Sequence, residues 1–282
     1  MKFYYGWFLP FVLAFIISSL LYVAFRDNVC IVRSGGMMPT IVKGEILLVK
    51  NAGKIQKNDI LLIDNPIRRD NKKDIHTVKR CVGLPGDTVE IKAKKLFING
   101  ELQRTDFCQF DRKFCFFSIN ELKTAARRYN IFPVNNTDMT QTVAVPESLF
   151  KKIRKENIIK NFSDNVLPDD LADRSLYPFS RLYNWNRDFY GPLVVPKKGL
   201  TLKLSIKSLI LYRFLIEKFE GVKIVVQDNK FYIDGKPVLT YTFKHDYYFV
   251  LNDYRDDVSD SRTFGLVQRD LVLGKYFYSV IF

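Results

Sequence analysis

The sequence predicts a mainly β protein with an α/β insertion, placed behind one N-terminal transmembrane helix. Three observations predict this fold class: an uncharged N-terminal stretch, short apolar runs between turn residues in both halves of the chain, and helix-like periodicity confined to the middle. We therefore expect an N-terminal tail (residues 1–3), a transmembrane helix (4–25), a β-rich core (26–118 and 220–282) and an α/β insertion (119–219).

Residues 4–25 contain no charged side chain. At a rise of about 1.5 Å per residue, about 20 residues cross a hydrocarbon core of roughly 30 Å, so the segment is long enough to span a membrane. A cleaved signal peptide is disfavoured, because the apolar run exceeds the usual length of about 7–15 residues and no small-x-small cleavage site follows it. Aromatic residues that suit the membrane interface lie near its ends: Tyr4, Tyr5, Trp7 and Tyr22.

The β-rich halves consist of short apolar runs separated by Gly, Asn and Asp. In the first half these runs occupy residues 28–34, 45–50, 59–64, 76–83, 87–93 and 95–100. Asn99-Gly100 and Asp234-Gly235 are hairpin turn signals, and the stretches around them resemble each other, which suggests a hairpin unit used twice. Strands are expected again from Val222 to Phe282.

The middle of the chain carries helix-like periodicity in residues 121–129, 147–160 and 205–219. A polar stretch rich in aspartate and proline surrounds residues 168–178. We interpret this region as an insertion between two β-rich halves of one core.

The formal net charge of +14 suits an anionic lipid surface or nucleic acid. The sequence has no paired Cys/His zinc spacing and no aromatic pattern of the RRM kind. Because the lysines and arginines are scattered, we expect a solvated basic surface near a membrane and no nucleic-acid partner.

The cysteines and histidines indicate at most one disulfide and no metal site. A hairpin or loop could join Cys108 to Cys115 as a disulfide, which would indicate an oxidising compartment, and two free buried thiols are the alternative. His76 and His245 lie near no cysteine pair, so we expect no metal site, and no cofactor is implied.

Five segments, taken in order, resemble the type I signal peptidases, which are serine proteases of the Ser/Lys type. The segment SGGMMPT (34–40) resembles the first conserved box of that family, and KRCVGLPGD (79–87) resembles its lysine box. KNDILL (57–62) is similar to the intervening box, and DYRDDVSDSRTFG (253–265) to the last one. GPLVVPKKG (191–199) also resembles a segment of some larger members.

The resemblance implies a β-rich catalytic domain on the outer, periplasmic side of the bacterial cytoplasmic membrane, held by a single span with a cytoplasmic N-terminus. Members of the family remove signal peptides from exported preproteins. The partners implied are the lipid bilayer, signal peptides and their preproteins, and the Sec translocon or another membrane secretion complex.

The resemblance also assigns residues to roles. Lys79 is the equivalent of the general base, and its apolar neighbours suit a buried amine that is neutral near the operating pH. Ser34 takes the oxyanion-hole position, and Met37, Met38 and Pro39 take substrate-binding positions. The nucleophile serine should precede Met37, and the sequence has Gly36 there.

Glycine has no side chain, so covalent catalysis through position 36 is impossible. Removing the nucleophile of a comparable serine protease costs about 10⁶ in kcat. Ser34 is a weak substitute, because on a strand its side chain would lie roughly 6–7 Å away on the same face, and a misplacement of about 1 Å already costs on the order of 10²-fold.

The last box departs from the family as well. Asn252 replaces a glycine, and Val258 replaces the serine that hydrogen-bonds the lysine. The retained residues are expected to support the site structurally: Arg80, Asp253, Arg255, Asp260, Ser261 and Arg262.

Coordinated changes favour a natural non-catalytic relative that acts as a peptide-binding or scaffold subunit of a secretion or processing complex. The alternative is an active signal peptidase I, a serine endopeptidase, whose serine was changed to Gly36 in this chain or is substituted by Ser34. A purely structural role without a peptide groove is the third hypothesis.

Overall fold

The structure is a computed structural model that describes residues 10–16, 19, 29–66, 76–129, 140–156 and 159–280. Residues 10–16 of the predicted span are helical, and most of residues 4–25 lies outside the described part of the chain. Among the described residues, no helix combines the length and the apolar character needed to cross a bilayer.

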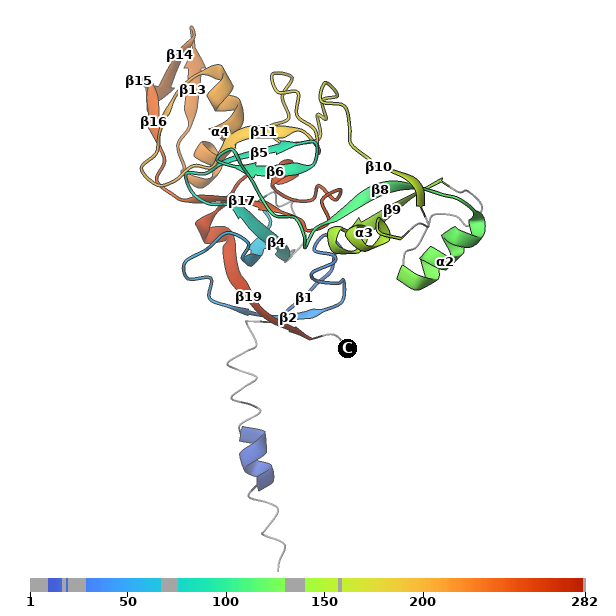
Figure 1. Ribbon diagram of the computed structural model, residues 1–282. Helices are drawn as coiled ribbons and strands as arrows, with labels where there is room; N and C mark the ends of the chain where they lie inside the picture. Colours follow the sequence, from blue (N-terminus) through green and yellow to red (C-terminus); the bar gives the residue numbers. More distant parts are fainter. Residues whose placement is uncertain are drawn as a thin grey trace, which may run out of the picture.

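The central feature of the fold is a seven-stranded sheet in the order β1-β2-β19-β3-β4-β17-β18. Its strands are β1 (Val29–Ile31), β2 (Ile46–Lys50), β3 (Ile60–Asp64), β4 (His76–Gly83), β17 (Tyr247–Leu251), β18 (Val267–Gln268) and β19 (Val272–Val280). The C-terminal strand β19 lies between β2 and β3, so the two ends of the domain share one sheet (Figure 1). The prediction of a mainly β fold is confirmed.

A second sheet has the order β11-β5-β6-β7, and a small third sheet is formed by β13, β14 and β15. The bounds are β5 (Thr88–Lys92), β6 (Lys95–Ile98), β7 (Glu101–Leu102), β11 (Tyr190–Val194), β13 (Ile224–Gln227), β14 (Lys230–Ile233) and β15 (Lys236–Val238). Asn99 and Gly100 connect β6 to β7 with φ of 54° and 83°. Asp234 and Gly235 connect β14 to β15 with φ of 49° and 76°. Both predicted hairpin turns are confirmed, with the positive φ that a type I′ turn requires.

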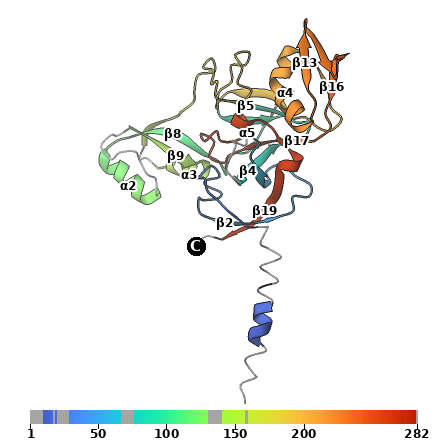
Figure 2. The ribbon, with the colours of Figure 1, turned by 180° about the vertical axis from the view of Figure 1, so that it is seen from behind.

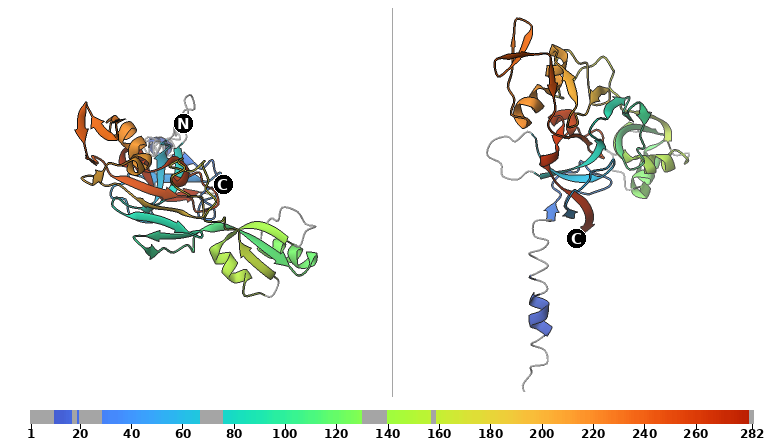
Figure 3. Two further views of the ribbon diagram at one scale, coloured as in Figure 1. Left: turned by 90° about the horizontal axis from the view of Figure 1, so that it is seen from above. Right: turned by 90° about the vertical axis from the view of Figure 1, so that its left-hand side faces the viewer.

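A separate lobe is built from a three-stranded sheet, β10-β8-β9, and two helices. Its elements are β8 (Gln109–Phe116), α2 (Ile119–Tyr129), β9 (Thr140–Pro146), α3 (Glu147–Ile153) and β10 (Ile159–Asp164). The lobe extends to one side of the central sheet (Figure 3). The helix expected over residues 147–160 is therefore wrong in its second half, because β10 pairs with β8 and hydrogen bonds of a sheet replace those of a helix there.

The remaining elements cover the second sheet and the end of β17. The strands β12 (Thr201–Lys203) and β16 (Thr240–Thr242) pair as a two-stranded ribbon; β12 precedes α4 (Ile206–Phe219), and β16 follows β15. The Ser205 side chain accepts a hydrogen bond from the Ser208 N–H and so caps α4. The largest apolar core cluster lies between α4, the second sheet and β17.

Cys108 and Cys115 are both free thiols. Cys108 immediately precedes β8 and Cys115 is its next-to-last residue, so seven extended positions at about 3.3 Å each separate them by roughly 23 Å, far beyond the reach of a disulfide. The alternative of two free thiols is therefore the correct one, and the cysteines give no information about the compartment.

Candidate active site

Four of the sequence motifs, 34–40, 57–62, 79–87 and 253–265, meet around β4, which lies between β3 and β17 in the central sheet. Lys79 lies on β4, opposite Leu61 of β3. On the other side of β4, Leu251 of β17 pairs with Arg80. Because the pairing is antiparallel, Asn252, one residue beyond β17, lies beside Lys79 with its side chain on the same face.

Gly36 reaches this point from the turn that follows β1. Residues 36–40 form the turn, and the Gly36 carbonyl accepts a hydrogen bond of 2.9 Å from the Tyr254 N–H. Gly36, Lys79 and Asn252, which are far apart in the sequence, are thus brought together. Ser34 precedes the turn and is exposed.

The space beside Gly36 is filled by Asn252. A Cβ atom at position 36 would lie 2.7 Å from Oδ1, 2.8 Å from Cγ and 2.9 Å from Nδ2 of Asn252. The backbone at Gly36 is not in the left-handed region, so a side chain is excluded by this neighbour and not by the backbone.

Asn252 itself is fully buried and held on its far side. Its Nδ2 donates hydrogen bonds to the Asp257 carbonyl at 2.9 Å and to the Ser259 hydroxyl at 3.2 Å. Its backbone N–H donates to Asp260 Oδ2 at 3.0 Å. Within the described part of the chain, the buried Oδ1 has no hydrogen-bond partner.

Lys79 is only 2% exposed. Burial lowers the pKa of its amine below the ordinary lysine value, and the carboxylates of Asp260 and Asp257 partly offset this effect. Among the residues that the structure describes, none forms a hydrogen bond or ion pair with the amine. A desolvated amine of this kind suits a general base, but no hydroxyl at position 36 is present for it to activate.

The loop after β17 is braced by a buried ion pair. Arg80 Nε donates to Asp253 Oδ1 at 2.6 Å, and Arg80 Nη2 approaches Asp253 Oδ2 at 2.5 Å. The hydroxyl of Thr40, the last residue of the turn, also donates to Asp253. Together these contacts join the turn that carries Gly36 to β4, which carries Lys79, and to the loop that begins at Asn252.

A second buried ion pair, Asp260–Arg262, stabilises the other end of the loop. Asp260 caps the short helix α5 (Ser261–Phe264) and pairs with Arg262, whose Nη2 lies 2.7 Å from Asp260 Oδ2. The Ser261 hydroxyl accepts a hydrogen bond from the Val250 N–H at 2.9 Å. Figure 2 shows α5 beside β17. Asp260, Ser261 and Arg262 thus hold the end of the loop against β17, and their supporting role at the site stays a prediction.

The other predicted residues are placed less simply. Met37 is 1% exposed and packs in a core cluster with Val32, Ile41, Leu47 and Val78, so it contributes to packing. Met38 is half-buried and Pro39 is exposed. Arg255 is buried, and its Nε and Nη2 have no partner among the described residues.

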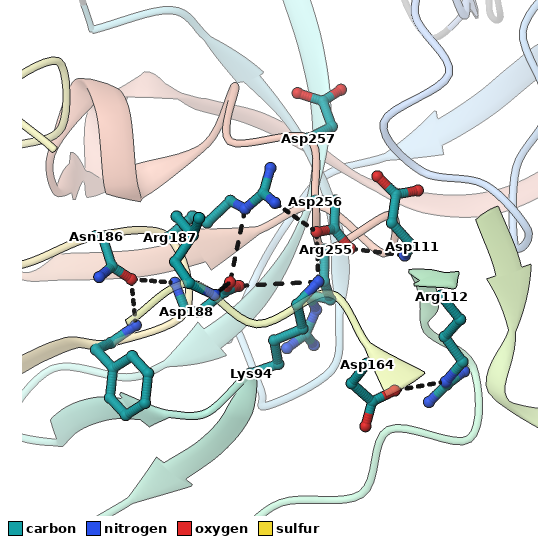
Figure 4. A network of polar contacts seen from close by, with 12 residues as sticks. Lys94, Asp111, Arg112, Asp164, Asn186, Arg187, Asp188, Arg255, Asp256 and Asp257 are labelled. Atoms are coloured by element: carbon teal, nitrogen blue, oxygen red, sulfur yellow. Dashed lines mark hydrogen bonds and ion pairs between the residues drawn. The ribbon is translucent and has the colours of Figure 1, made fainter. Parts of the chain in front are cut away.

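The sequence did not predict a polar network that contacts Asp256, in the loop between β17 and α5 (Figure 4). Lys94 Nζ lies 2.5 Å from Asp256 Oδ1 and 3.9 Å from Asp188 Oδ1, and Arg187 lies 3.6 Å from Asp256. The Asp111 N–H donates to Asp256 Oδ2 at 2.8 Å, which joins β8 to the loop. Burial raises the pKa of Asp188 above the usual carboxyl range. The charges are scattered in the sequence, and no local pattern indicates that they meet.

A buried lysine beside a glycine-bearing turn, at the edge of a mainly β domain, has the build of the Ser/Lys peptidases without their serine. The model of the family described as "Signal peptidase, peptidase S26" matches residues 4–156 and 239–281, and the chain belongs to this family. The resemblance predicted from the sequence is confirmed.

Individual relatives agree with this assignment. The signal peptidase I of Bacillus licheniformis is 35% identical over 102 residues, which cover 35% of this chain and 52% of the relative. The signal peptidase I of Buchnera aphidicola subsp. Schizaphis graminum is 25% identical over 278 residues, which cover 94% of this chain and 70% of the relative. The chain thus spans about half the length of the Bacillus relatives it matches.

Among solved structures, a signal peptidase I from Enterococcus faecalis is 19% identical and covers 79% of this chain and 96% of its own. The superposition has a TM-score of 0.27.

Proposed function

We propose that this chain is a non-hydrolytic relative of signal peptidase I that binds the signal peptides of exported preproteins. Residues 4–25 hold it in the bacterial cytoplasmic membrane, with the N-terminus in the cytoplasm and the folded domain on the outer side. It acts there as a peptide-binding or scaffold subunit beside the Sec translocon or another membrane secretion complex.

The observation that carries this proposal is the close contact between Gly36 and the Asn252 side chain. Position 36 supplies no hydroxyl, and the space that a hydroxyl would need is occupied by the Asn252 amide. Ser34 is exposed and two residues away, and a misplaced nucleophile loses about 10²-fold per ångström. Hydrolysis through a serine at this site is therefore not expected.

The surroundings of the site support a retained binding role. The Arg80–Asp253 and Asp260–Arg262 pairs fix the turn and the loop on both sides of Gly36. The peptide is expected to bind near Ser34, Gly36 and Lys79, the positions at which the family holds its substrate.

Lys79 favours a second candidate, an active signal peptidase I whose serine was replaced by Gly36. The amine is buried and its pKa is lowered, which a binding protein does not need. In this case only the serine would have to be restored for cleavage.

Both candidates are tested with the full chain in detergent, a preprotein, and a fluorescent peptide that carries its signal sequence. A signal peptidase I of Bacillus serves as the positive control for cleavage. The proposal expects saturable peptide binding and no cleavage by the chain. Efficient cleavage by the unaltered chain, or the absence of peptide binding, contradicts it. Efficient cleavage by Gly36→Ser alone supports the second candidate.

A further inference from the structure

We propose that Asn252 has taken over the volume of the missing nucleophile, so that position 36 cannot carry any side chain while Asn252 is present. This inference rests on the proposed function, a non-hydrolytic relative of signal peptidase I, and deepens it. It says that two residues, Gly36 and Asn252, together prevent hydrolysis. A serine at position 36 alone would then not restore the site.

The first argument is steric. Three heavy atoms of the Asn252 amide lie within 2.9 Å of the place where a Cβ at position 36 would be. Real Cβ atoms essentially never approach other atoms below 3.0 Å, so either residue would have to move. Even alanine would meet the same contact, because the clash begins at Cβ.

The second argument is that Asn252 is not free to move. Its Nδ2 is held by the Asp257 carbonyl and the Ser259 hydroxyl, and its backbone N–H by Asp260. Rotating the amide away from Gly36 breaks both side-chain hydrogen bonds of a residue that is itself fully buried. The flexible end of an exposed side chain could move aside at little cost, but the Asn252 amide can move only by losing these hydrogen bonds.

The third argument concerns Lys79. The register of Leu251 with Arg80 places Asn252 beside Lys79, across the boundary between β17 and β4. Asn252 therefore contacts the turn that carries Gly36 and is next in register to the residue that carries the amine.

The neighbouring glycine provides a matched control. A Cβ at Gly35 would meet only the Met38 Sδ, at 3.5 Å, which is an ordinary contact with a flexible side chain. Gly35 directly precedes Gly36 and the turn, and neither glycine has a left-handed φ. A serine at position 35 therefore tests the loss of glycine without the clash.

The experiment compares the full chain in detergent with Gly36→Ser, Asn252→Gly, the double variant and Gly35→Ser. Thermal unfolding is expected to show a Tm lower by about 4–8 °C for Gly36→Ser and by about 1 °C or less for Gly35→Ser. Asn252→Gly alone also lowers Tm, because it removes two hydrogen bonds and leaves a void. The double variant is expected to be clearly more stable than the sum of the two single changes predicts.

Each result decides for or against the inference. Equal Tm values for Gly36→Ser and Gly35→Ser, strictly additive effects, or preprotein cleavage by Gly36→Ser alone would overturn it. If Gly36→Ser does not fold, recovery of folded protein on adding Asn252→Gly supports the inference, and no recovery overturns it. The thermal comparison needs no peptide, so failure of the proposed function in the binding assay remains a separate result.

Discussion

The Arg80–Asp253 pair offers the sharpest test of how the site is held. Asp253→Asn keeps the shape of the side chain and removes its charge. Asp253 is fully buried and Arg80 is 7% exposed, so the change leaves a buried guanidinium without its counter-charge. Breaking a buried pair by removing one partner costs about 3–5 kcal/mol. Arg80 keeps its hydrogen bond of 2.9 Å to the Asn58 carbonyl, so we expect the lower end, about 3 kcal/mol.

The assay is thermal unfolding of the full chain in detergent, followed by circular dichroism. For a domain of this size, about 1 kcal/mol shifts Tm by roughly 2–4 °C, so Asp253→Asn should lower Tm by about 6–12 °C. Glu90→Gln is the matched control, because Glu90 pairs with Lys92 at 2.8 Å on the surface. Surface pairs contribute about 0–1 kcal/mol, so this variant should change Tm by no more than about 4 °C.

A third variant distinguishes an unpaired charge from lost packing. Replacing both partners, with Arg80→Met and Asp253→Leu, removes the buried charge altogether and should be less destabilising than Asp253→Asn. The reasoning is refuted if Asp253→Asn lowers Tm no more than Glu90→Gln does. It is also refuted if the double replacement is the least stable of the variants.

Three further predictions concern other buried groups. Because the pKa of Lys79 is lowered in the folded state, the unfolded chain binds its proton more tightly, and stability rises with pH through the window between the two pKa values. Lys79→Met should therefore have a higher Tm than the unaltered chain at pH 7, and the difference in Tm should shrink toward a pH of about 10. A difference in Tm that does not change with pH would contradict this. Cys108, fully buried and with its pKa raised by burial to about 11, should react with maleimide at pH 8 much more slowly than Cys115. Maleimide labelling of the denatured, unreduced chain should modify all four cysteines, whereas two cysteines left unmodified would reveal a disulfide. Glu220 accepts hydrogen bonds from the Tyr241 and Tyr247 hydroxyls, so Glu220→Ala should cost about 2–4 kcal/mol, measured as a fall in Tm; a loss below about 1 kcal/mol would show that water replaces the carboxylate.

Local signals made most of the strands predictable. Asn-Gly and Asp-Gly pairs favour the positive φ values of a tight hairpin, so the turns at Asn99-Gly100 and Asp234-Gly235 depend on two residues each. β10 was not predictable in the same way, because residues 159–164 form a strand by pairing with β8, a partner far away in the sequence. The possible disulfide failed for a related reason, since the seven positions from Cys108 to Cys115 run along one extended strand instead of around a loop.

The candidate site was predictable as a set of positions and not as a set of contacts. Motif order and residue identity indicate Gly36, Lys79 and the last box, because each motif is local. The contact between Gly36 and Asn252 depends on the register of β17 against β4 and on the path of the turn after β1. The only signal in the sequence was an asparagine at a position where the family has glycine, and it did not indicate what the asparagine touches.

The contact also bears on how the serine came to be absent. A chain with serine at position 36 and Asn252 would place the serine Cβ within 2.9 Å of the amide, so that combination is strained. A glycine at position 36 must therefore precede or accompany Asn252. A disabled enzyme in which only the serine was exchanged would still have the family's glycine at position 252. Because Asn252 fills the space instead, and Val258 stands where the family has the serine that would hold the lysine, we infer that the site was repacked after the loss of a nucleophile. This supports a natural non-catalytic protein over an engineered substitution.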